Sequence, residues 1–498
     1  MDRSAGVLLA VSSLPSKYGI GCFSKEAYQF VDWIKEAGQS YWQILPLGPT
    51  GYGDSPYQSF STYAGNPYFI DLEALITEGV LSEEECNSID FGKRAGTINY
   101  KKLYKGRYIL LRKAYERSDI SNNAEYQLFV QENGWWLHDY ALYMAVKGRF
   151  GGKPWTDWAE DIRFRWENAM DYYRRELYFD IEFQMYMQFV FFKQWNALKA
   201  YANEKGIRII GDIPIYVAMD SADTWAHPEL FQLDGENVPE AVAGCPPDGF
   251  SATGQLWGNP LYRWDYHRKT GFQWWTRRLE YCFCMYDVVR IDHFRGFDEY
   301  FSIPYGEESA VNGHWEKGPG IELFRKVEES IGWKQVIAED LGYVTDSVRQ
   351  MVWESGFPGM KVLEFAFDSR DTGCASDYLP HNYPENSVAY TGTHDNETVI
   401  GWFASISEEE REMARAYMCD TYTPEDKLYV PFIGLVMRSR ANLCIVPMQD
   451  YLGYDNFARM NHPSTVGKNW KWRLKGTELT GKLQKFILNM TGQYDRVK

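Results

Sequence analysis

Long apolar runs are missing from this 498-residue sequence. A helix that crosses a membrane needs about 20 predominantly apolar residues, and no run approaches that length. The apolar run from Gly6 to Val11 is also too short for the core of a signal peptide, which takes about 7–15 residues. We therefore expect a soluble, cytoplasmic protein without a membrane partner.

Basic residues are fewer than acidic residues in this sequence. The chain has 52 Lys and Arg residues against 68 Asp and Glu residues, which gives a formal net charge of -16 at pH 7. No basic run is interleaved with aromatic residues. Nucleic acids and anionic membranes attract basic surfaces, so this charge balance argues against both as partners.

Paired cysteine spacings are lacking as well. The eight cysteines are scattered, and the C-x-C formed by Cys282 and Cys284 has no second half elsewhere in the chain. A zinc site is therefore not expected, and the pattern favours reduced thiols. Nothing in the sequence implies a metal or an organic cofactor.

Aromatic residues, in contrast, are abundant: 19 Trp, 36 Tyr and 28 Phe. Most of them must belong to a bulky core. The excess of Trp and Tyr still fits sugar binding, because the apolar face of a sugar ring stacks on aromatic rings whose polar tips stay in water.

Short apolar runs that end in polar residues, Gly or Pro recur along the chain and predict buried strands. These runs are Gly6–Ala10, Tyr41–Leu45, Ile207–Ile213, Asp287–Ile291, Gln335–Ala338, Lys361–Phe367, Ser387–Thr391 and Leu443–Pro447. Helical patterns lie between them, as in Lys25–Ala37 and Ile181–Lys205, each followed by Gly. Repeated strand–helix alternation predicts an α/β fold of the (β/α)8 TIM-barrel type, although an open sheet has a similar pattern.

The spacing of the predicted strands is uneven. The second and third lie far apart, whereas a barrel unit needs only about 30 residues. We therefore expect residues 1–74 to form the first part of the barrel, 75–168 an inserted, mostly helical subdomain, and 169–498 the remainder. A loop-rich insertion at about 214–286 is expected to cover the C-terminal face of the strands, where barrel enzymes keep their sites.

Three acids stand at the ends of predicted strands in the second half of the chain: Asp292, Glu339 and Asp395. An apolar run that stops on an acid is costly unless the acid has partners or a function. Three in succession predict a ring of carboxylates at the mouth of a parallel barrel. This arrangement suits chemistry on a glycosidic bond.

The surroundings of the first two acids suggest different roles. Arg290 precedes Asp292 by two positions, so both side chains should point to one side of the strand, and the guanidinium should lower the pKa of Asp292. A structural salt bridge is the alternative. Glu339 follows Val336-Ile337-Ala338, and partial burial should raise its pKa, as a general acid requires. The alternative is an acid at a helix N-terminus.

Further polar residues accompany these acids. Asp395 could hydrogen-bond two adjacent sugar hydroxyls, and His293 and His394 are neutral donors of suitable reach. Asp212 ends the third predicted strand, where a turn-stabilising role is an equal alternative. Each histidine alone is more simply a structural residue, but their occurrence at successive strand ends favours function.

The sequence resembles the 4-α-glucanotransferases of glycoside hydrolase family 77, also called amylomaltases or disproportionating enzymes. The matching motifs cover nearly the whole chain, and Gln-Leu-Trp-Gly-Asn-Pro is the one that separates this family from the wider α-amylase-like clan. They include the segments 13–16, 42–50, 55–61, 64–68, 211–218, 254–260, 290–296, 338–342, 392–396 and 469–470.

The resemblance implies a retaining double displacement on malto-oligosaccharide or other α-1,4-glucan donors, with a sugar as the acceptor. It implies that Asp292 is the nucleophile, Glu339 the acid/base, and Asp395 the residue that binds and distorts the reactive glucose. It further places Arg290, His293, His394 and Asp212 in the same glucose site. By the same resemblance, Tyr57 and Trp257 stack on the glucan chain.

Two positions depart from the family pattern: Ser464, where relatives often carry Gly, and Glu364, where many carry Gln. Neither is one of the three acids. Two other classes stay open on the residues alone, namely an α-glucan hydrolase and a non-catalytic glucan-binding protein. The sequence does not specify donor length, formation of cyclic glucans or the oligomeric state.

Overall fold

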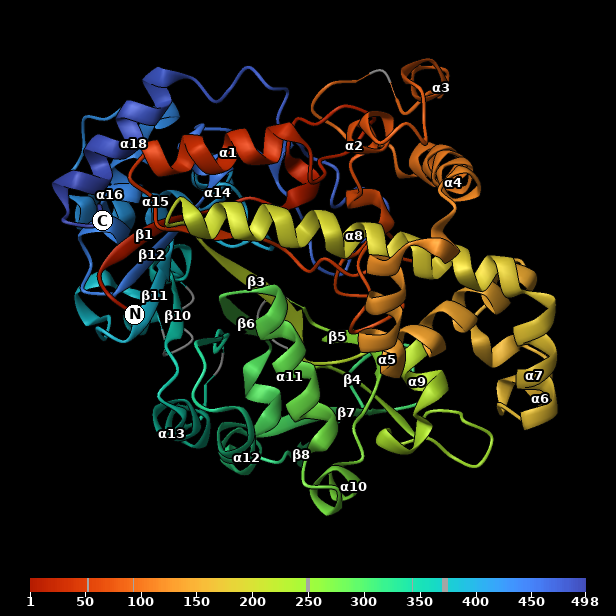
Figure 1. Cartoon of the computed structure of the whole chain (residues 1–498). Helices are drawn as coiled ribbons and strands as arrows, with labels where there is room; N and C mark the ends of the chain where they lie inside the picture. The colour runs from red at the N-terminus through yellow and green to blue at the C-terminus, as the bar shows by residue number, and fades with distance from the viewer. Residues whose placement is uncertain (52, 93, 248–250, 343, 370–374) are drawn as a thin grey trace.

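The computed structural model describes residues 1–51, 53–92, 94–247, 251–342, 344–369 and 375–498 (Figure 1). Its centre is a closed barrel of parallel strands in the order β1-β12-β11-β10-β9-β6-β3-β2. The strands are β1 Ser4–Leu8, β2 Tyr41–Gln43, β3 Arg208–Pro214, β6 Val288–Asp292, β9 Val336–Ala338, β10 Gly359–Val362, β11 Ser387–Tyr390 and β12 Leu443–Pro447. The predicted (β/α)8 barrel is therefore confirmed.

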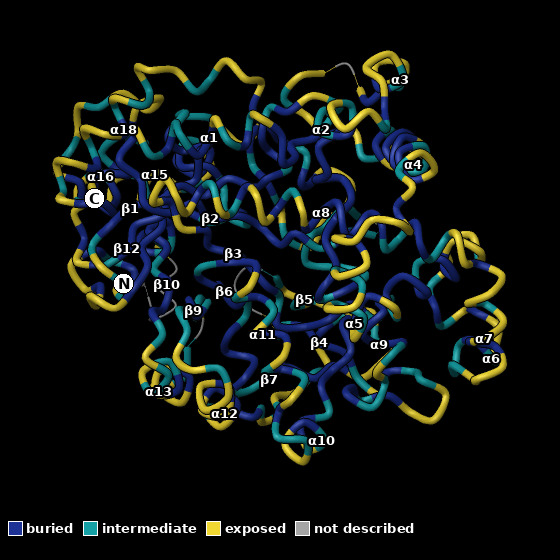
Figure 2. The backbone as a smooth tube through the Cα atoms, in the orientation of Figure 1, coloured by how far each residue is buried: buried dark blue, intermediate teal, exposed yellow. Residues whose placement is uncertain are grey.

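The barrel strands consist of nearly continuous apolar residues, as expected for strands of which both faces are buried. All five residues of β1 and of β12 are buried, and these two strands pair in register from Ser4 with Leu443 to Leu8 with Pro447. Figure 2 shows this burial: the barrel strands are mostly buried, whereas exposed residues gather on outer helices such as α6 and α7. A Cβ on Gly6 would lie 2.6 Å from the carbonyl oxygen of Tyr41, so a side chain there would disturb the β1–β2 pair.

One predicted strand ends earlier than expected. The run Lys361–Phe367 was expected to be extended, but β10 is Gly359–Val362 and a 3-10 helix, Leu363–Phe367, follows it. Periodicity alone does not separate a short buried strand from a short buried helical turn, because both are continuously apolar. The turn has a consequence for the site, since it carries Glu364 into the interior.

Helices cover the outside of the barrel. Helix α1, Lys25–Glu36, begins after Ser24, and α8, Tyr178–Glu204, begins slightly before its predicted start. The helices in the second half of the chain are α11 Gln273–Met285, α12 Ile321–Ile331, α13 Asp346–Ser355, α14 Val399–Ser405, α15 Glu408–Met418, α16 Tyr429–Arg438, α17 Met448–Tyr451 and α18 Gly481–Gln493.

The chain between β2 and β3 is mostly helical, as expected. In Figure 1 its outer helices lie on the side of the molecule away from β1 and β12. The boundaries 75–168 stay a prediction. The helices are α2 Leu72–Thr77, α3 Glu83–Asn87, α4 Tyr100–Arg117, α5 Ala124–Arg149, α6 Glu160–Arg163 and α7 Glu167–Glu176, ahead of α8.

The segment expected to be loop-rich, 214–286, is more regular than the sequence indicated. Besides α11 it contains α9 Ala222–Ala226, α10 Trp264–Lys269 and the strands β4 Ala241–Cys245 and β5 Gln255–Pro260. These strands join β7 Glu299–Pro304 and β8 His314–Lys317 in an antiparallel sheet of order β5-β4-β7-β8. The Gly and Pro residues of β5 indicated a loop, because they are rare inside strands. Residues 248–250 lie outside the described part of the chain.

Among the described helices, none is long and apolar enough to cross a lipid bilayer.

Candidate active site

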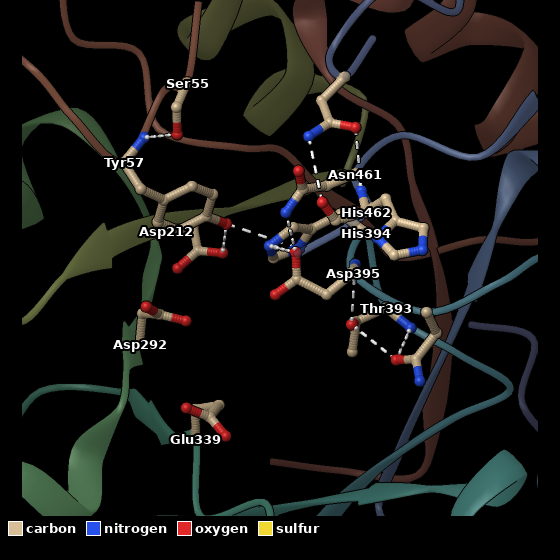
Figure 3. Close-up of polar contacts among 12 residues, drawn as sticks. Ser55, Tyr57, Asp212, Asp292, Glu339, Thr393, His394, Asp395, Asn461 and His462 are labelled. Carbon is tan, nitrogen blue, oxygen red and sulfur yellow. Dashed lines mark hydrogen bonds and ion pairs between the residues drawn. The ribbon is translucent and has the colours of Figure 1, made fainter. Parts of the chain in front are cut away.

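The predicted acids converge at the C-terminal ends of neighbouring barrel strands (Figure 3). In β3 and β6, Asp212 pairs with Arg290 and Pro214 with Asp292, and Ile291 of β6 pairs with Ala338 of β9. Glu339 is the residue directly after β9. Parallel strands end on the same edge of a sheet, so their register alone brings these side chains to one mouth.

Arg290 links two of the acids. Its Nη1 donates to both carboxylate oxygens of Asp212, at 2.7 and 2.8 Å, and to Oδ1 of Asp292 at 3.1 Å. The side chains of Arg290 and Asp212 are 3% and 0% exposed, whereas that of Asp292 is 29% exposed. The prediction that Arg290 and Asp292 point to one side is confirmed. Asp212 serves in this ion pair and not in a turn.

The pKa of Asp292 is shifted in the direction opposite to the one expected. Burial raises it to about 6, and the opposing effect of the Arg290 guanidinium is smaller. Asp212 and Asp395 add negative charge nearby and push the pKa further up. The expectation of a lowered pKa was wrong because Arg290 shares its charge with the fully buried Asp212 and cannot offset the loss of water around Asp292.

Glu339 lies next to Asp292, below it in Figure 3. Its Oε2 accepts from the backbone N–H of His293 at 2.6 Å, and its Oε1 from that of Leu341 at 3.0 Å. Burial, and then the negative charge of Asp292, raise its pKa to about 7, so the expected rise is confirmed. The alternative of a helix N-terminus fails, because α13 begins only at Asp346.

The next residue, Asp340, supports the strand end. Its Oδ1 accepts from the backbone N–H of Met360 at the start of β10, at 2.7 Å. The carboxyl also lies against Gly359, where a Cβ would meet it at 2.4 Å. Asp340 therefore ties β9 to β10 directly behind Glu339.

Asp395 lies on the loop between β11 and α14 and is more open than Asp292, with a side chain 44% exposed against 29%. Asn461 Nδ2 donates to its Oδ1 at 2.6 Å, and Arg459 Nη2 donates to its backbone carbonyl at 2.8 Å. Sequence analysis missed both residues. They lie more than 60 positions further on in a segment without a recognisable pattern, so no local signal could have identified them.

Tyr57 and His394 form a stacked pair beside Asp212. The ring centroids lie 5.0 Å apart with an interplanar angle of 15°, and the Tyr57 hydroxyl donates to Oδ2 of Asp212 at 2.8 Å. His394 Nε2 lies 3.5 Å from Oδ1 of Asp395. These contacts bring the two predicted binding residues into the same polar network as Arg290.

His293 and Trp257 lie on the Glu339 side of the mouth. His293 has a left-handed backbone with φ of 54°, which aims its N–H at Glu339. Burial lowers the pKa of His293 to about 3, so the imidazole is neutral at pH 7, as predicted. The Trp257 ring on β5 meets the His293 ring edge-on, with centroids 4.8 Å apart.

All nine predicted site residues therefore lie in one connected region. Among the residues that the structure describes, no group of three or more His, Cys, Asp or Glu side chains could hold a metal ion. The positive charge at the centre of this site is supplied by Arg290. The arrangement places the partly exposed carboxyl of Asp292 beside the carboxyl of Glu339, whose pKa is raised. This suits nucleophilic attack combined with proton transfer.

Comparison with known proteins agrees with this geometry. The family model for 4-alpha-glucanotransferase matches residues 9–480. A 4-alpha-glucanotransferase of Clostridium butyricum is 48% identical over 98% of this chain and 99% of that protein, and one of Thermus thermophilus is 47% identical over 96% of each. The solved amylomaltase of Streptococcus agalactiae in complex with acarbose superposes with a TM-score of 0.96 at 42% identity over the full length of both chains. The chain therefore belongs to the 4-α-glucanotransferases of glycoside hydrolase family 77, as its motifs predict.

Proposed function

We propose that the protein transfers α-1,4-glucan segments between malto-oligosaccharides and releases glucose, by a retaining double displacement. The observation that carries this proposal is the position of Asp292 at the end of β6 and of Glu339 directly after the adjacent strand β9. Burial raises the pKa of both carboxyls, and Asp292 raises that of Glu339 further. Two acids in different surroundings can divide the roles of nucleophile and proton donor.

In the first step an Oδ of Asp292 attacks the anomeric carbon of the donor. The bond between that carbon and the glycosidic oxygen breaks, and Glu339 gives its proton to the departing oxygen. Arg290 contacts Asp292 but makes no contact with Glu339 among the described hydrogen bonds and ion pairs. It therefore favours the charge on Asp292, which leaves the shared proton on Glu339.

In the second step the 4-hydroxyl of an acceptor sugar loses its proton to Glu339, and its oxygen attacks the anomeric carbon. The bond to Asp292 breaks and both carboxyls return to their starting forms. This mechanism retains the anomeric configuration and predicts carboxyl groups about 5–5.5 Å apart in a substrate complex, whereas a separation of about 9 Å would favour inversion.

Asp395 is proposed to bind and distort the reactive glucose through two adjacent hydroxyls. Its side chain is partly exposed and, among the described hydrogen bonds, accepts from the side chain of Asn461 alone, which leaves acceptor capacity for a sugar. Asp212, Arg290, His293 and His394 line the same position. Tyr57 and Trp257 are proposed to flank the glucan chain and to favour a sugar acceptor over water.

Incubation of the purified protein with maltotriose alone tests the transfer. A ladder of longer oligosaccharides together with free glucose, resolved by chain length, is the expected result. Glucose and maltose alone would mean that water is the acceptor and that the protein is an α-glucan hydrolase. No turnover at all would favour a glucan-binding protein.

A Glu339→Gln variant separates the two roles of this residue. We expect it to lose about 10²–10⁴-fold in rate on maltotriose, because the leaving oxygen is no longer protonated. With an α-maltosyl fluoride donor, whose leaving group needs no proton, the first step should recover. Equal losses on both donors would contradict the assignment of Glu339 as the acid.

A further inference from the structure

A buried carboxyl that the mechanism does not use lies behind Asp395. Glu364, on the 3-10 helix after β10, is only 5% exposed. Its Oε1 is buried and has no hydrogen-bond partner, and the described ion pairs include none to Glu364. A buried carboxyl without a partner is costly, so its surroundings call for an explanation.

The two acids whose negative charges act on Glu364 have, in contrast, hydrogen-bond donors of their own. Asp450, at the start of α17, accepts from Thr391 Oγ1 at 2.6 Å and from the Val399 N–H at 2.8 Å, and so holds both ends of the loop that carries Asp395. Glu397 accepts from Asn456 Nδ2 and from Ser405 Oγ, each at 2.6 Å. Glu364 is thus the one of the three with a buried carboxyl oxygen, Oε1, that has no hydrogen-bond partner.

The carboxyl of Glu364 packs directly against the turn that leads to Asp395. Its Oε1 lies 3.0 Å from the position of a Cβ built on Gly392, and the Cβ of Asn396 lies 3.1 Å from the same position. The turn is closed by Asn396 Oδ1, which accepts from the N–H and the Oγ1 of Thr393 at 2.9 and 2.8 Å. Thr393 Oγ1 in turn accepts from the Asp395 N–H at 3.3 Å. A shift of Glu364 would therefore reach Asp395 through one short turn.

Negative charge surrounds this carboxyl. Burial raises the pKa of Glu364 well above its ordinary value, and the charges of Asp450 and Glu397 add to the rise. Arg459 and Asn396 act in the opposite direction, but the Arg459 guanidinium is occupied by the carbonyl oxygens of Asp395 and Asn461 and lies 3.7 Å from Glu397.

Two other elements pack against this 3-10 helix, the 3-10 helix Ala375–Tyr378 and α15, and neither supplies a free counter-charge. The charged residue of the first is Asp377, an acid that pairs with Arg349. In α15, Arg411 donates to the carbonyl oxygen of Phe403, and Arg415 donates to that of Thr423. An ionised Glu364 would therefore face two carboxylates without a cation of its own.

We propose that Glu364 is a positioning residue for Asp395: its uncharged acid form supports the Gly392–Asn396 turn, and ionisation displaces this turn and weakens glucan binding. The proposal rests on the glucan-binding role of Asp395 proposed above. It makes Glu364 a pH-sensitive support of a binding residue and not a catalytic residue.

The test compares binding of maltohexaose to Glu339→Gln protein with and without the further change Glu364→Gln, by calorimetry between pH 7 and 9. The Glu339→Gln background slows turnover by about 10²–10⁴-fold and removes the titration of Glu339 itself. Gln has the size of the uncharged acid. In Glu339→Gln protein, which keeps Glu364, we expect the Kd for maltohexaose to rise with pH, by up to about tenfold per pH unit above the pKa of Glu364. In the protein that carries both changes, we expect the Kd to be independent of pH. Equal slopes in both would overturn the proposal.

Glu397→Gln in the same background is the matched control, because it removes a neighbouring carboxylate that already has partners. It should leave the rise of Kd with pH in place. If Glu364→Gln does not fold, Glu364→Met replaces it, as a neutral side chain of similar length. Transfer by the wild-type protein on maltotriose is measured in parallel, so a failure of the proposed function is seen separately from a failure of this inference.

Thermal unfolding gives an independent readout of the charge on Glu364. A carboxyl whose pKa is higher in the folded than in the unfolded protein makes its full contribution to stability below the pKa of the unfolded state. This contribution is lost as the pH rises towards the pKa of the folded state. The Tm of Glu364→Gln relative to wild type should therefore increase from pH 5 to pH 8. If the Tm of Glu364→Gln minus that of wild type falls over this range, the folded protein stabilises the ionised form of Glu364, and the proposal is overturned.

Discussion

The two sides of the catalytic mouth are built differently. On one side, Asp212, Arg290 and Asp292 belong to β3 and β6, and their contacts follow from the register of adjacent strands. On the other side, Asp395 lies on a loop and is held by Asn461, 66 positions away. The acids proposed for bond chemistry are thus placed at the ends of paired strands, and the acid proposed for binding is placed by contacts between loops.

The strongest test of the strand side is Asp292→Asn. We expect this variant to lose at least about 10⁴-fold in kcat, because the nucleophile is removed while the shape is kept. Product formation from maltotriose measures the loss, and an unchanged Tm and circular dichroism spectrum serve as the control. Substantial remaining turnover would reject Asp292 as the nucleophile.

The pH dependence of kcat/KM tests whether Asp292 and Glu339 titrate as a coupled pair. Asp292 must be ionised and Glu339 protonated, so kcat/KM should fall below the raised pKa of Asp292, about 6, and above that of Glu339, about 7. Each limb should reach about tenfold per pH unit, with apparent values that belong to the pair. A profile that is flat from pH 5 to pH 8 would contradict this coupling.

The loop side is tested by Asn461→Ala, which removes the donor to Oδ1 of Asp395. A hydrogen bond to a charged group contributes about 1.5–3 kcal/mol, so we expect a loss of about tenfold or more in kcat/KM, mainly through KM. His462→Ala is the matched control, because among the described hydrogen bonds the ring of this exposed neighbour has one partner, the carbonyl oxygen of Pro463. Equal effects of both variants would mean that the loop as a whole is disturbed.

Acceptor choice is tested by Trp257→Ala. The indole packs on His293 beside Glu339, and its loss should lower the ratio of transfer to hydrolysis by about fivefold, or about 1 kcal/mol. Leu256→Ala is the control, because side chains alternate along β5 and Leu256 is 40% exposed. The measurement is the ratio of longer oligosaccharides to total reducing ends, and an unchanged ratio would count against a role in excluding water.

The smallest effect is expected at Ser464, on the loop side. Ser464 has φ of 62°, a left-handed conformation that Gly adopts without strain. This conformation explains why a Gly suits the position. We expect Ser464→Gly to raise the free energy of unfolding by roughly 1 kcal/mol or less, measured by chemical denaturation. Ser464→Ala keeps the Cβ and should give no gain; a gain of the same size would exclude backbone strain as the cause.

The features of the fold that the sequence predicted correctly are those that depend on a local pattern of residues. All eight barrel strands were located, because each is a short apolar run with a polar end, and Asp292, Glu339 and Asp395 followed from those ends. The strands β4 and β5 were missed, since their Gly and Pro residues indicate loops. The end of β10 was also misplaced, because its apolar run continues into a helical turn.

The sequence by itself determined the strand order along the chain, the identity of the paired acids and the family, because these depend on residue type and spacing. Only the tertiary structure decided how those acids are charged and held. Burial outweighs Arg290 at Asp292, Asn461 reaches Asp395 from a distant loop, and Oε1 of Glu364 lies without a hydrogen-bond partner against the turn that carries Asp395. Desolvation and long-range contacts arise from the packing of segments far apart in the chain, and no local pattern records them.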